Sequence, residues 1–179
     1  MSDVQITMVR PDLDDLPAVC IAPGYEVKTA ADFDDPVAVW IEAINNSFEN
    51  TTWTREWVSE QFTGKEQYDP EGVFFAMYGD TPASTAFAWI DEPSEQVMGR
   101  VHYVGTVAAH RKQGLARVLV LTVLHHLRGK GLVRAMLETQ PYRLPAISVY
   151  LNLGFEPAPG DALEQQEAWK QVMEQLGRR

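Results

Sequence analysis

A strand-like run that passes through a glycine loop into an amphipathic helix, between Val101 and Gly131, is the feature that most constrains the fold. The residues of Val101–Val107 are typical of a strand, and apolar residues from Ala116 to Leu127 recur at helical spacing. Between them, Arg111, Gly114 and Ala116 have the spacing R-x-x-G-x-A. The sequence therefore predicts a strand, a loop with little side-chain bulk, and a helix that begins directly after it.

This loop has the properties of an anion-binding site. The first N–H groups of a helix lack intrahelical acceptors, and the helix dipole adds a partial positive charge there. Gly114 would let a phosphate approach the backbone, and Arg111, Lys112 and Arg117 add full charges. A pyrophosphate is the group we expect. Glycine at such a turn is also common for structural reasons alone, so the loop by itself leaves both interpretations open.

Composition predicts one compact domain without disulfides. The chain has 179 residues, of which 45% are hydrophobic, and a single cysteine, Cys20. No Cys/His cluster has metal-ligand spacing, so no metal is expected. The N-terminus lacks a basic segment followed by an apolar one, and no run approaches the roughly 18 apolar residues of a membrane span. We expect a cytoplasmic protein with no membrane partner.

Charge is divided unevenly along the chain. Residues 1–99 contain 4 basic and 19 acidic residues, whereas residues 100–143 contain 8 basic residues and one acidic residue, Glu138. A basic segment around a glycine loop favours a polyanionic cofactor, and the acidic remainder favours a cationic, amine-bearing partner over nucleic acid. The acidic surface could equally serve solubility alone.

The apolar pattern and the turn residues predict an alternation of strands and helices. Residues 1–24 are expected to form an N-terminal arm, 25–158 the main domain, and 159–179 a C-terminal helix of that same domain. Strands are expected at 25–29, 72–78, 83–90, 101–107, 132–138 and from 155, and helices from 34 to 44, from 53 to near 64, from 114 to 128, from 144 to 153 and from 161 to 176. This order predicts an α/β fold whose mixed sheet has antiparallel strands first and a right-handed β-α-β crossover after them.

The element order and two separate motifs resemble those of the GCN5-related N-acetyltransferase (GNAT) family. Arg111, Gly114 and Ala116 match its acyl-CoA loop, R/Q-x-x-G-x-G/A. Downstream, the family often carries L-E-V before N-x-x-A-x-x-x-Y-x-x-x-G-F. Here the matching residues are Leu137, Glu138, Ala146, Tyr150, Gly154 and Phe155. The resemblance covers roughly residues 25–158. Arg143 replaces the usual Asn, Thr139 replaces Val, and Thr106 replaces a small aliphatic residue.

The resemblance implies the GNAT fold, with a splayed parallel pair of strands, and acetyl transfer from acetyl-CoA as cosubstrate to an amine. The pantetheine amides would bind between strands 101–107 and 132–138 like an added strand. The residues it implies for binding the cosubstrate are Thr106, Val107, Ala108, Arg111, Lys112, Gln113, Gly114, Leu115, Ala116, Arg117 and Arg143. Arg143 either replaces the contact made by the Asn or closes the loop before Pro145.

Two titratable residues are the catalytic candidates. By analogy with the family, Tyr150 would protonate the leaving thiolate, since a phenol of ordinary pKa near 10 is a fair donor; it could instead be a packing aromatic. Glu138 could accept the amine proton, directly or through water, or could only pair with a nearby arginine. His102 and Tyr103 are weaker alternatives, and a backbone N–H near Val107 would hold the oxyanion.

Other candidates have less support from the sequence. His125 and His126 lie mid-helix, where packing is expected, and Trp40, Trp53, Trp57 and Phe62 have core spacing, although an aromatic in these helices could face an acceptor. The acceptor pocket would be shaped by the early helices and the loop from Asp91 to Gly99. We expect a small-molecule or peptide amine as acceptor and consider a homodimer through the terminal helix. A non-catalytic acyl-CoA-binding module is the alternative. A nucleotide-binding protein is disfavoured because G-x-x-x-x-G-K-[ST] and G-x-G-x-x-G are missing.

Overall fold

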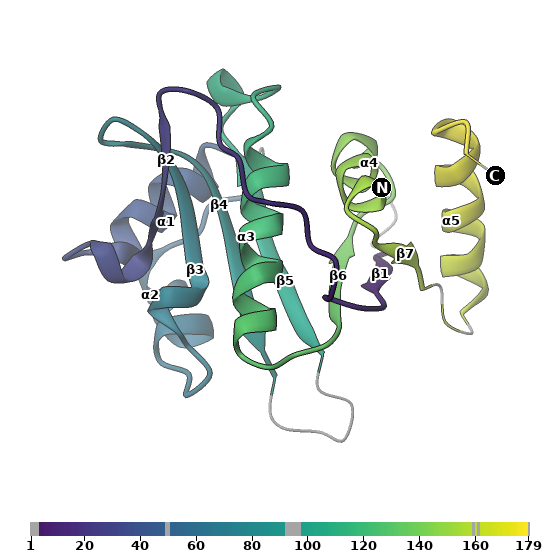
Figure 1. Ribbon diagram of the computed structural model, residues 1–179, viewed down its shortest axis with the longest axis horizontal. Coiled ribbons are helices and arrows are strands. Elements are labelled where there is room, and N and C mark those ends of the chain that lie inside the picture. The colour runs from purple at the N-terminus through teal and green to yellow at the C-terminus, as the bar shows by residue number, and fades with distance from the viewer. Residues whose placement is uncertain (1–3, 49–50, 92–97, 159, 161, 179) are drawn as a thin grey trace.

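The computed structural model describes residues 4–48, 51–91, 98–158, 160 and 162–178. In this part of the chain one seven-stranded sheet has the order β2-β3-β4-β5-β6-β1-β7 (Figure 1). From the β2 edge inward, the strands β2 (Tyr25–Thr29), β3 (Val73–Tyr78), β4 (Thr81–Ile90) and β5 (Gly99–Thr106) are antiparallel neighbours. β6 (Ala135–Thr139) lies parallel to β5. The predicted mixed α/β fold is therefore confirmed.

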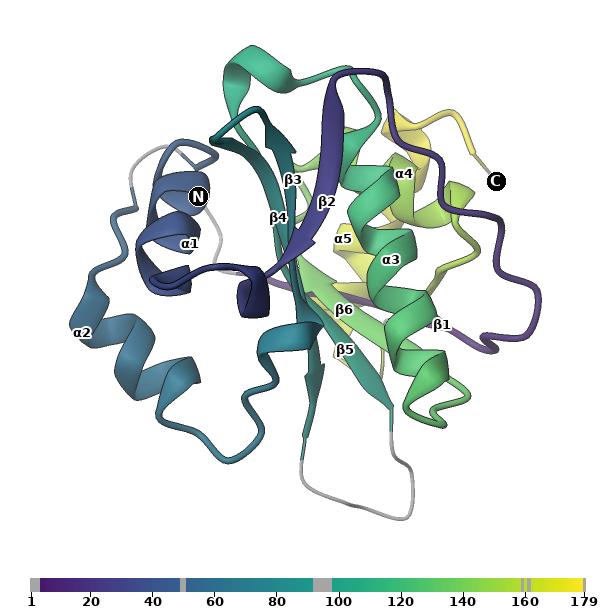
Figure 2. The ribbon, with the colours of Figure 1, turned by 60° about the vertical axis from the view of Figure 1, so that its left-hand side comes forward.

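Helices cover the two faces of this sheet. Helix α3 (Leu115–Gly129) lies on one face, while α1 (Pro36–Asn45) and α2 (Arg55–Val58) lie on the other (Figure 2). Helices α4 (Leu144–Asn152) and α5 (Leu163–Gln175) follow β6 and β7 (Glu156–Pro157). The expected start of α5 at residue 161 falls outside the described residues. α3 begins after Gly114 because its eight buried residues are spaced to form one apolar face.

The second expected helix is shorter than its apolar spacing suggests. Thr54 caps α2 by accepting a hydrogen bond from the Trp57 N–H at 3.3 Å, so Trp53 precedes the helix. After one α-turn the chain continues as a π-helical turn over Ser59–Thr63, which closes when the Gly64 N–H donates to the Ser59 carbonyl at 2.8 Å.

The N-terminal stretch contains a strand that the sequence analysis places in an arm. Residues Ile6–Arg10 form β1, which pairs antiparallel with β6 on one side and with β7 on the other. Ile6 and Met8 are fully buried. The alternating pattern is visible in the sequence, but partners about 130 residues away are not. Within the expected N-terminal arm, these five residues therefore form a strand of the sheet that was not predicted.

β5 and β6 separate along their length. Their pairing is confined to Gly99 with Ala135 and Arg100 with Met136, and β6 begins three residues later than the expected Leu132. From Val101 onward β5 pairs only with β4 among the described residues. The predicted splayed parallel pair is thus confirmed, and it leaves backbone groups of both strands facing a gap.

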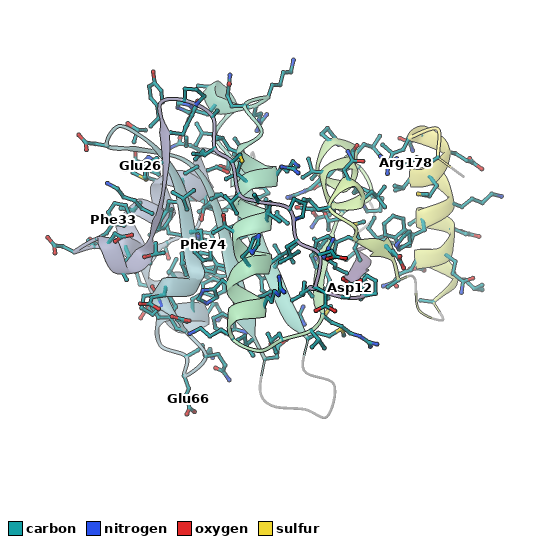
Figure 3. All side chains as sticks on the ribbon, in the orientation of Figure 1. Asp12, Glu26, Phe33, Glu66, Phe74 and Arg178 are labelled. Atoms are coloured by element: carbon teal, nitrogen blue, oxygen red, sulfur yellow. The ribbon has the colours of Figure 1, made fainter. Side chains whose placement is uncertain are left out.

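Two apolar clusters pack against the sheet. The larger one surrounds α3 and extends to β1, α4 and α5, whereas the smaller one is rich in aromatic rings and lies between the sheet and α1 and α2. Phe74 lies within the body of the molecule on the α3 side, whereas the side chains of Glu26 and Glu66 point outward (Figure 3). Arg178 instead points toward α4, where its guanidinium donates to the Asn152 side chain at 2.6 Å. The two clusters hold β5 firmly, so that the gap beside it has a rigid wall.

Candidate active site

The glycine loop has the geometry of an anion site. Lys112 and Gly114 both adopt positive φ angles, 65° and 77°, and the first helical hydrogen bond of α3 runs from the Val118 N–H to the Gly114 carbonyl at 3.0 Å. The preceding amides therefore lack intrahelical acceptors. A Cβ built on Gly114 would meet nothing within 4 Å, so space is open beside the backbone. The residues present fit a pyrophosphate at this helix terminus.

The side chains of the loop divide into exposed and anchoring groups. Lys112, Gln113 and Arg117 are exposed, as an anion site requires. The guanidinium of Arg111 instead donates to two backbone carbonyls, that of Thr106 at 3.3 Å and that of Ser47 at 3.1 Å. Arg111 thus ties the loop to β5 and to the end of α1. The side chain of Leu115 is buried in the core, which leaves only its backbone to face a ligand.

A second anchor of the loop was missed by the sequence analysis. The Tyr25 hydroxyl and the His110 Nδ1 lie 2.9 Å apart, and the His110 ring also contacts the ring of Tyr78, with centroids 5.5 Å apart. These contacts hold the loop against β2 and β3. Tyr25 and His110 are 85 positions apart, so no local pattern could have predicted the pair.

β5 carries a bulge where it borders the gap. Thr85 of β4 pairs with Gly105, but Phe87 pairs with His102, which leaves one extra residue on β5. Tyr103 within this bulge has a φ of 49°, an uncommon conformation for a bulky residue. The bulge stacks the His102 ring on the Tyr103 ring, with centroids 5.5 Å apart and an angle of 24° between the planes.

A cavity of about 380 Å³ lies where β5 and β6 separate. Its wall combines β5, β6, the start of α4 and the segment after α1, and it brings together both predicted catalytic residues. The lining residues are Gln5, Phe48, Thr51, Trp53, Val101, His102, Tyr103, Val104, Leu137, Glu138, Thr139, Gln140, Tyr142, Arg143 and Tyr150.

The aromatic residues of the early helices serve two purposes. Trp40 and Phe62 are buried in the core, as expected, with exposed fractions of 2% and 6%. Trp53 instead lines the cavity. The side-chain amide of Asn45 fixes the backbone of Trp53 through two hydrogen bonds, of 2.8 and 3.1 Å. Trp53 is therefore the residue of this group that faces the cavity.

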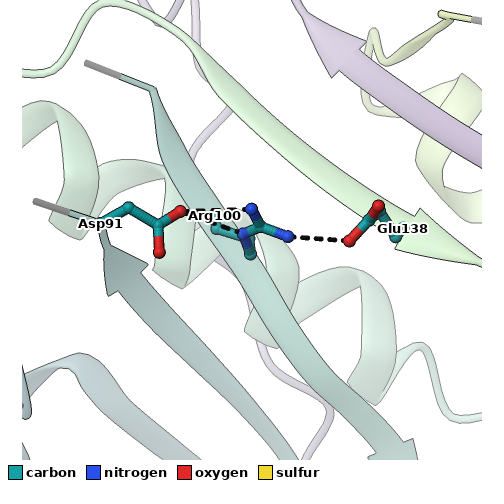
Figure 4. Close-up of polar contacts among 3 residues, drawn as sticks. All are labelled: Asp91, Arg100 and Glu138. Atoms are coloured by element: carbon teal, nitrogen blue, oxygen red, sulfur yellow. Dashed lines mark hydrogen bonds and ion pairs between the residues drawn. The ribbon is translucent and has the colours of Figure 1, made fainter. Parts of the chain in front are cut away.

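Glu138 forms an ion pair at the edge of the cavity (Figure 4). Arg100 Nη1 lies 2.8 Å from Glu138 Oε2, and Arg100 Nη2 lies 3.2 Å from Asp91 Oδ2. One guanidinium thus bridges two carboxylates, one on β6 and one at the end of β4. Glu138 thus pairs with an arginine, which was the alternative to its role as base, and Arg100 compensates its charge.

Tyr150 faces the cavity from α4 and is deeply buried. Its exposed fraction is 5%, and burial raises the pKa of its hydroxyl to about 12, an effect that the nearby Arg143 opposes. The pKa therefore lies above the ordinary value near 10, and the hydroxyl stays protonated and able to donate a hydrogen bond into the cavity.

Among the backbone N–H groups near Val107, where an oxyanion donor is expected, that of Val107 itself is engaged elsewhere. The Val107 N–H donates to the Ala83 carbonyl at 2.9 Å, which continues the pairing of β5 with β4. The hydroxyl of Thr106 lies 2.9 Å from that of Ser84. Neither group is directed to the gap. Ala108 follows in a short 3₁₀ turn, Ala108–His110, that leads into the glycine loop.

Arg143 lines the cavity opposite β5. Its guanidinium carbon lies 4.5 Å from the centroid of the Phe48 ring and 5.7 Å from that of Tyr142, so the group is held by cation–π contacts. Among the described residues it forms no ion pair. Of the described residues that line the cavity, Arg143 is the one that is a lysine or an arginine.

The histidines separate clearly by environment. Burial, assisted by the charge of Arg100, lowers the pKa of His102 to about 4, so its imidazole is neutral near pH 7. On α3, His125 Nε2 lies 2.8 Å from the Pro17 carbonyl, and His126 Nε2 lies 3.2 Å from Asp69 Oδ2. Both helix histidines therefore pack against neighbouring segments, as expected.

The described residues contain neither a metal-binding cluster nor a membrane-spanning helix. No group of three or more His, Cys, Asp and Glu side chains in these residues is arranged to hold a metal ion. None of the described helices has both the length and the apolar character needed to span a bilayer.

Comparison with known proteins identifies the class that this loop, gap and cavity represent. The model of the acetyltransferase (GNAT) family matches residues 39–155, and the chain belongs to this family. It is 30% identical to the mycothiol acetyltransferase of Thermomonospora curvata over 90% of its own length and 54% of that protein. Identity with the mycothiol acetyltransferase of Mycobacteroides abscessus is 31%, over 88% and 54% of the two chains. The chain spans about half the length of these relatives.

Solved structures share the fold. A GCN5-related N-acetyltransferase from Sphaerobacter thermophilus superposes with a TM-score of 0.71 at 23% identity, over 86% of this chain and 48% of that one. The ribosomal-protein-S18-alanine N-acetyltransferase of Escherichia coli superposes with a TM-score of 0.59 at 18% identity, over 75% and 79%.

Proposed function

We propose that this chain transfers an acetyl group from acetyl-CoA to a primary amine by direct attack of the amine on the thioester. The observation that carries the proposal is the cavity between β5 and β6, which brings Glu138 and Tyr150 to one space in a chain of the GNAT family. Both substrates would be bound together, because the chemistry needs no covalent acetyl-enzyme.

The cosubstrate would bind along the loop and the gap. Its pyrophosphate would lie at the start of α3, against the backbone of Gly114, Leu115 and Ala116 and near Lys112 and Arg117. The pantetheine amides would pair with backbone groups of β5 and β6 that no described strand occupies. Arg111 would act indirectly, by holding the loop in shape.

The proton steps would use the two lining residues. Glu138 would accept the proton of the attacking amine, directly or through water, with the carboxylate oriented by the bond from Arg100 to its Oε2. Tyr150 would donate a hydrogen bond to the sulfur of the leaving thiolate. The N–C bond forms, the C–S bond breaks with its electron pair on sulfur, and the amine proton leaves through the base to solvent.

The acceptor would be a polar amine of modest charge. The carboxylate of Glu138 is compensated by Arg100, and Arg143 adds a positive charge to the wall. No acidic residue among the described part of residues 1–99 lines the cavity. A polycation therefore has little support. Relatives of about 30% identity are named mycothiol acetyltransferases, which makes a mycothiol-type acceptor the first to test.

A second candidate, a non-catalytic acyl-CoA-binding module, is favoured by one observation, the ion pair that compensates Glu138. One experiment separates the two. Acetyl-CoA binding is measured by calorimetry, and release of CoA is measured with a panel of neutral, cationic and anionic primary amines. We expect binding and amine-dependent CoA release. Acetyl-CoA binding without CoA release for any amine would support the non-catalytic module. Binding of ATP but not of acetyl-CoA would contradict both candidates.

A further inference from the structure

Two requirements of the proposed reaction concern negative charge: the carbonyl oxygen becomes negative in the tetrahedral intermediate, and the sulfur becomes negative as the thiolate leaves. Backbone groups of β5 that face the gap can serve the oxygen, although the Val107 N–H itself is bonded to the Ala83 carbonyl. The phenol of Tyr150 lines the same cavity, and burial raises its pKa, so it suits a hydrogen bond to sulfur. Because both demands concern negative charge that develops at the thioester, a fixed positive group in the cavity would meet them.

Arg143 is placed to be that group. Its guanidinium, from the β6 side of the gap, stacks on the Phe48 ring. The Phe48 ring in turn lies against β5, since a Cβ built on Gly105 would be 2.9 Å from Phe48 Cε2. Arg143 therefore extends across the gap between the separated strands. The contacts with Phe48 and Tyr142 hold its planar group in place without neutralising its charge.

The anionic group that Arg143 would contact in the cavity can be narrowed down by excluding the other charged groups. The phosphates of CoA would lie at the Gly114 loop, and no residue from Arg111 to Arg117 lines the cavity. The pantetheine arm is uncharged. Glu138, the carboxylate that the described residues contribute to the cavity wall, is paired with Arg100. Two sources of negative charge remain: an anionic acceptor, which the kinetic test below separates, and the charge that the reaction itself creates on the carbonyl oxygen and then on sulfur.

We propose that Arg143 stabilises the CoA thiolate as it leaves, a role that rests on the proposed acetyl transfer. The amine nitrogen bonds to the carbonyl carbon, and the C–S bond breaks with its electron pair on sulfur. The sulfur remains a thiolate beside Arg143, with a hydrogen bond from Tyr150, and takes its proton from solvent. Arginine suits this role because it keeps its charge at every relevant pH.

The test measures the thiol pKa of bound CoA, through the ultraviolet absorbance of the thiolate, from neutral to alkaline pH. Wild type is compared with Arg143→Gln and Arg143→Lys. Arg128→Gln serves as the matched control, because it removes an exposed charge at the far end of α3. In wild type we expect a thiol pKa about one unit below that of free CoA, by analogy with thiols beside cations. Arg143→Gln should remove this shift, Arg143→Lys should keep part of it, and Arg128→Gln should keep all of it.

Kinetics provide the second readout. Arg143→Gln should lower kcat by about 10- to 100-fold while acetyl-CoA, which has no thiol, binds as in wild type. An unchanged thiol pKa in Arg143→Gln would overturn this inference, as would an increase in KM confined to anionic acceptors, which would make Arg143 an acceptor-binding residue. Failure of wild type to bind acetyl-CoA would overturn the proposed function as well, whereas turnover with an unshifted thiol would overturn only the role of Arg143.

Discussion

The two ends of β5 differ in their neighbours. At Gly99 and Arg100 the strand is paired on both sides, with β4 and with β6, whereas from Val101 to Thr106 it is paired with β4 alone in the described chain. The paired end is tightly packed, since a Cβ on Gly99 would lie 2.5 Å from a methyl carbon of Leu127. The open end carries the bulge and borders the cavity. One strand is thus part of the packed sheet at its start and part of the cavity wall further on.

The largest expected effect concerns the loop that follows the open end. Gly114→Glu should weaken acetyl-CoA binding by at least about 1,000-fold, because a carboxylate would occupy the space for the pyrophosphate. Calorimetry measures the dissociation constant of acetyl-CoA. Gly129→Glu, which adds the same charge in open space at the other end of α3, is the control.

A smaller substitution at the same position separates charge from backbone conformation. Gly114→Ala should lower the free energy of unfolding by about 1 kcal/mol, because Gly114 has a positive φ, and should have a far smaller effect on binding. Equal binding by Gly114→Glu and wild type would remove the loop from the site.

The second prediction uses His102 at the open end. Its folded-state pKa, about 4, lies below the ordinary 6.5, so the unfolded chain binds the proton more readily. This contribution to stability is complete above pH 6.5 and is lost as the pH falls toward 4, by about 3 kcal/mol. Denaturant unfolding of wild type and His102→Gln at several pH values measures it. The difference in unfolding free energy between the two should change across this range; a constant difference would show that His102 titrates normally.

The third prediction addresses the paired end. Gly99→Ala should lower the free energy of unfolding by about 2 kcal/mol, because the added methyl group would overlap the fully buried Leu127. The double variant Gly99→Ala/Leu127→Val should recover part of this loss by making room. Chemical denaturation measures both. If Gly99→Ala were as stable as wild type, the paired end of β5 would not be tightly packed.

The smallest effect is expected at Tyr150, within the cavity. Tyr150→Phe should reduce kcat by about 10-fold, the value of one hydrogen bond to a charged group, and leave acetyl-CoA binding nearly intact. Because the pKa of Tyr150 is about 12, the alkaline limb of the rate profile should not change below pH 10. Steady-state rates across pH measure both. An unaltered kcat would exclude Tyr150 from stabilising the leaving group.

Local signals in the sequence predicted a large part of this molecule. Apolar periodicity located α1, α3, α4 and α5 and most strands, and the glycine loop with the Y-x-x-x-G-F helix identified the family before any geometry was available. They succeeded because helix spacing, capping and glycine conformations are decided by neighbours a few residues apart.

Contacts between distant segments decided the rest. The insertion of β1 between β6 and β7, the anchoring of Arg111 on Ser47, the pairing of Arg100 with Glu138 and the stacking of Arg143 on Phe48 each join residues 38 to about 150 positions apart. The sequence alone determined most of the helices and strands and the glycine loop that precedes α3. Only the tertiary structure decided which charges are compensated, since pairing and desolvation depend on neighbours in space rather than in the chain.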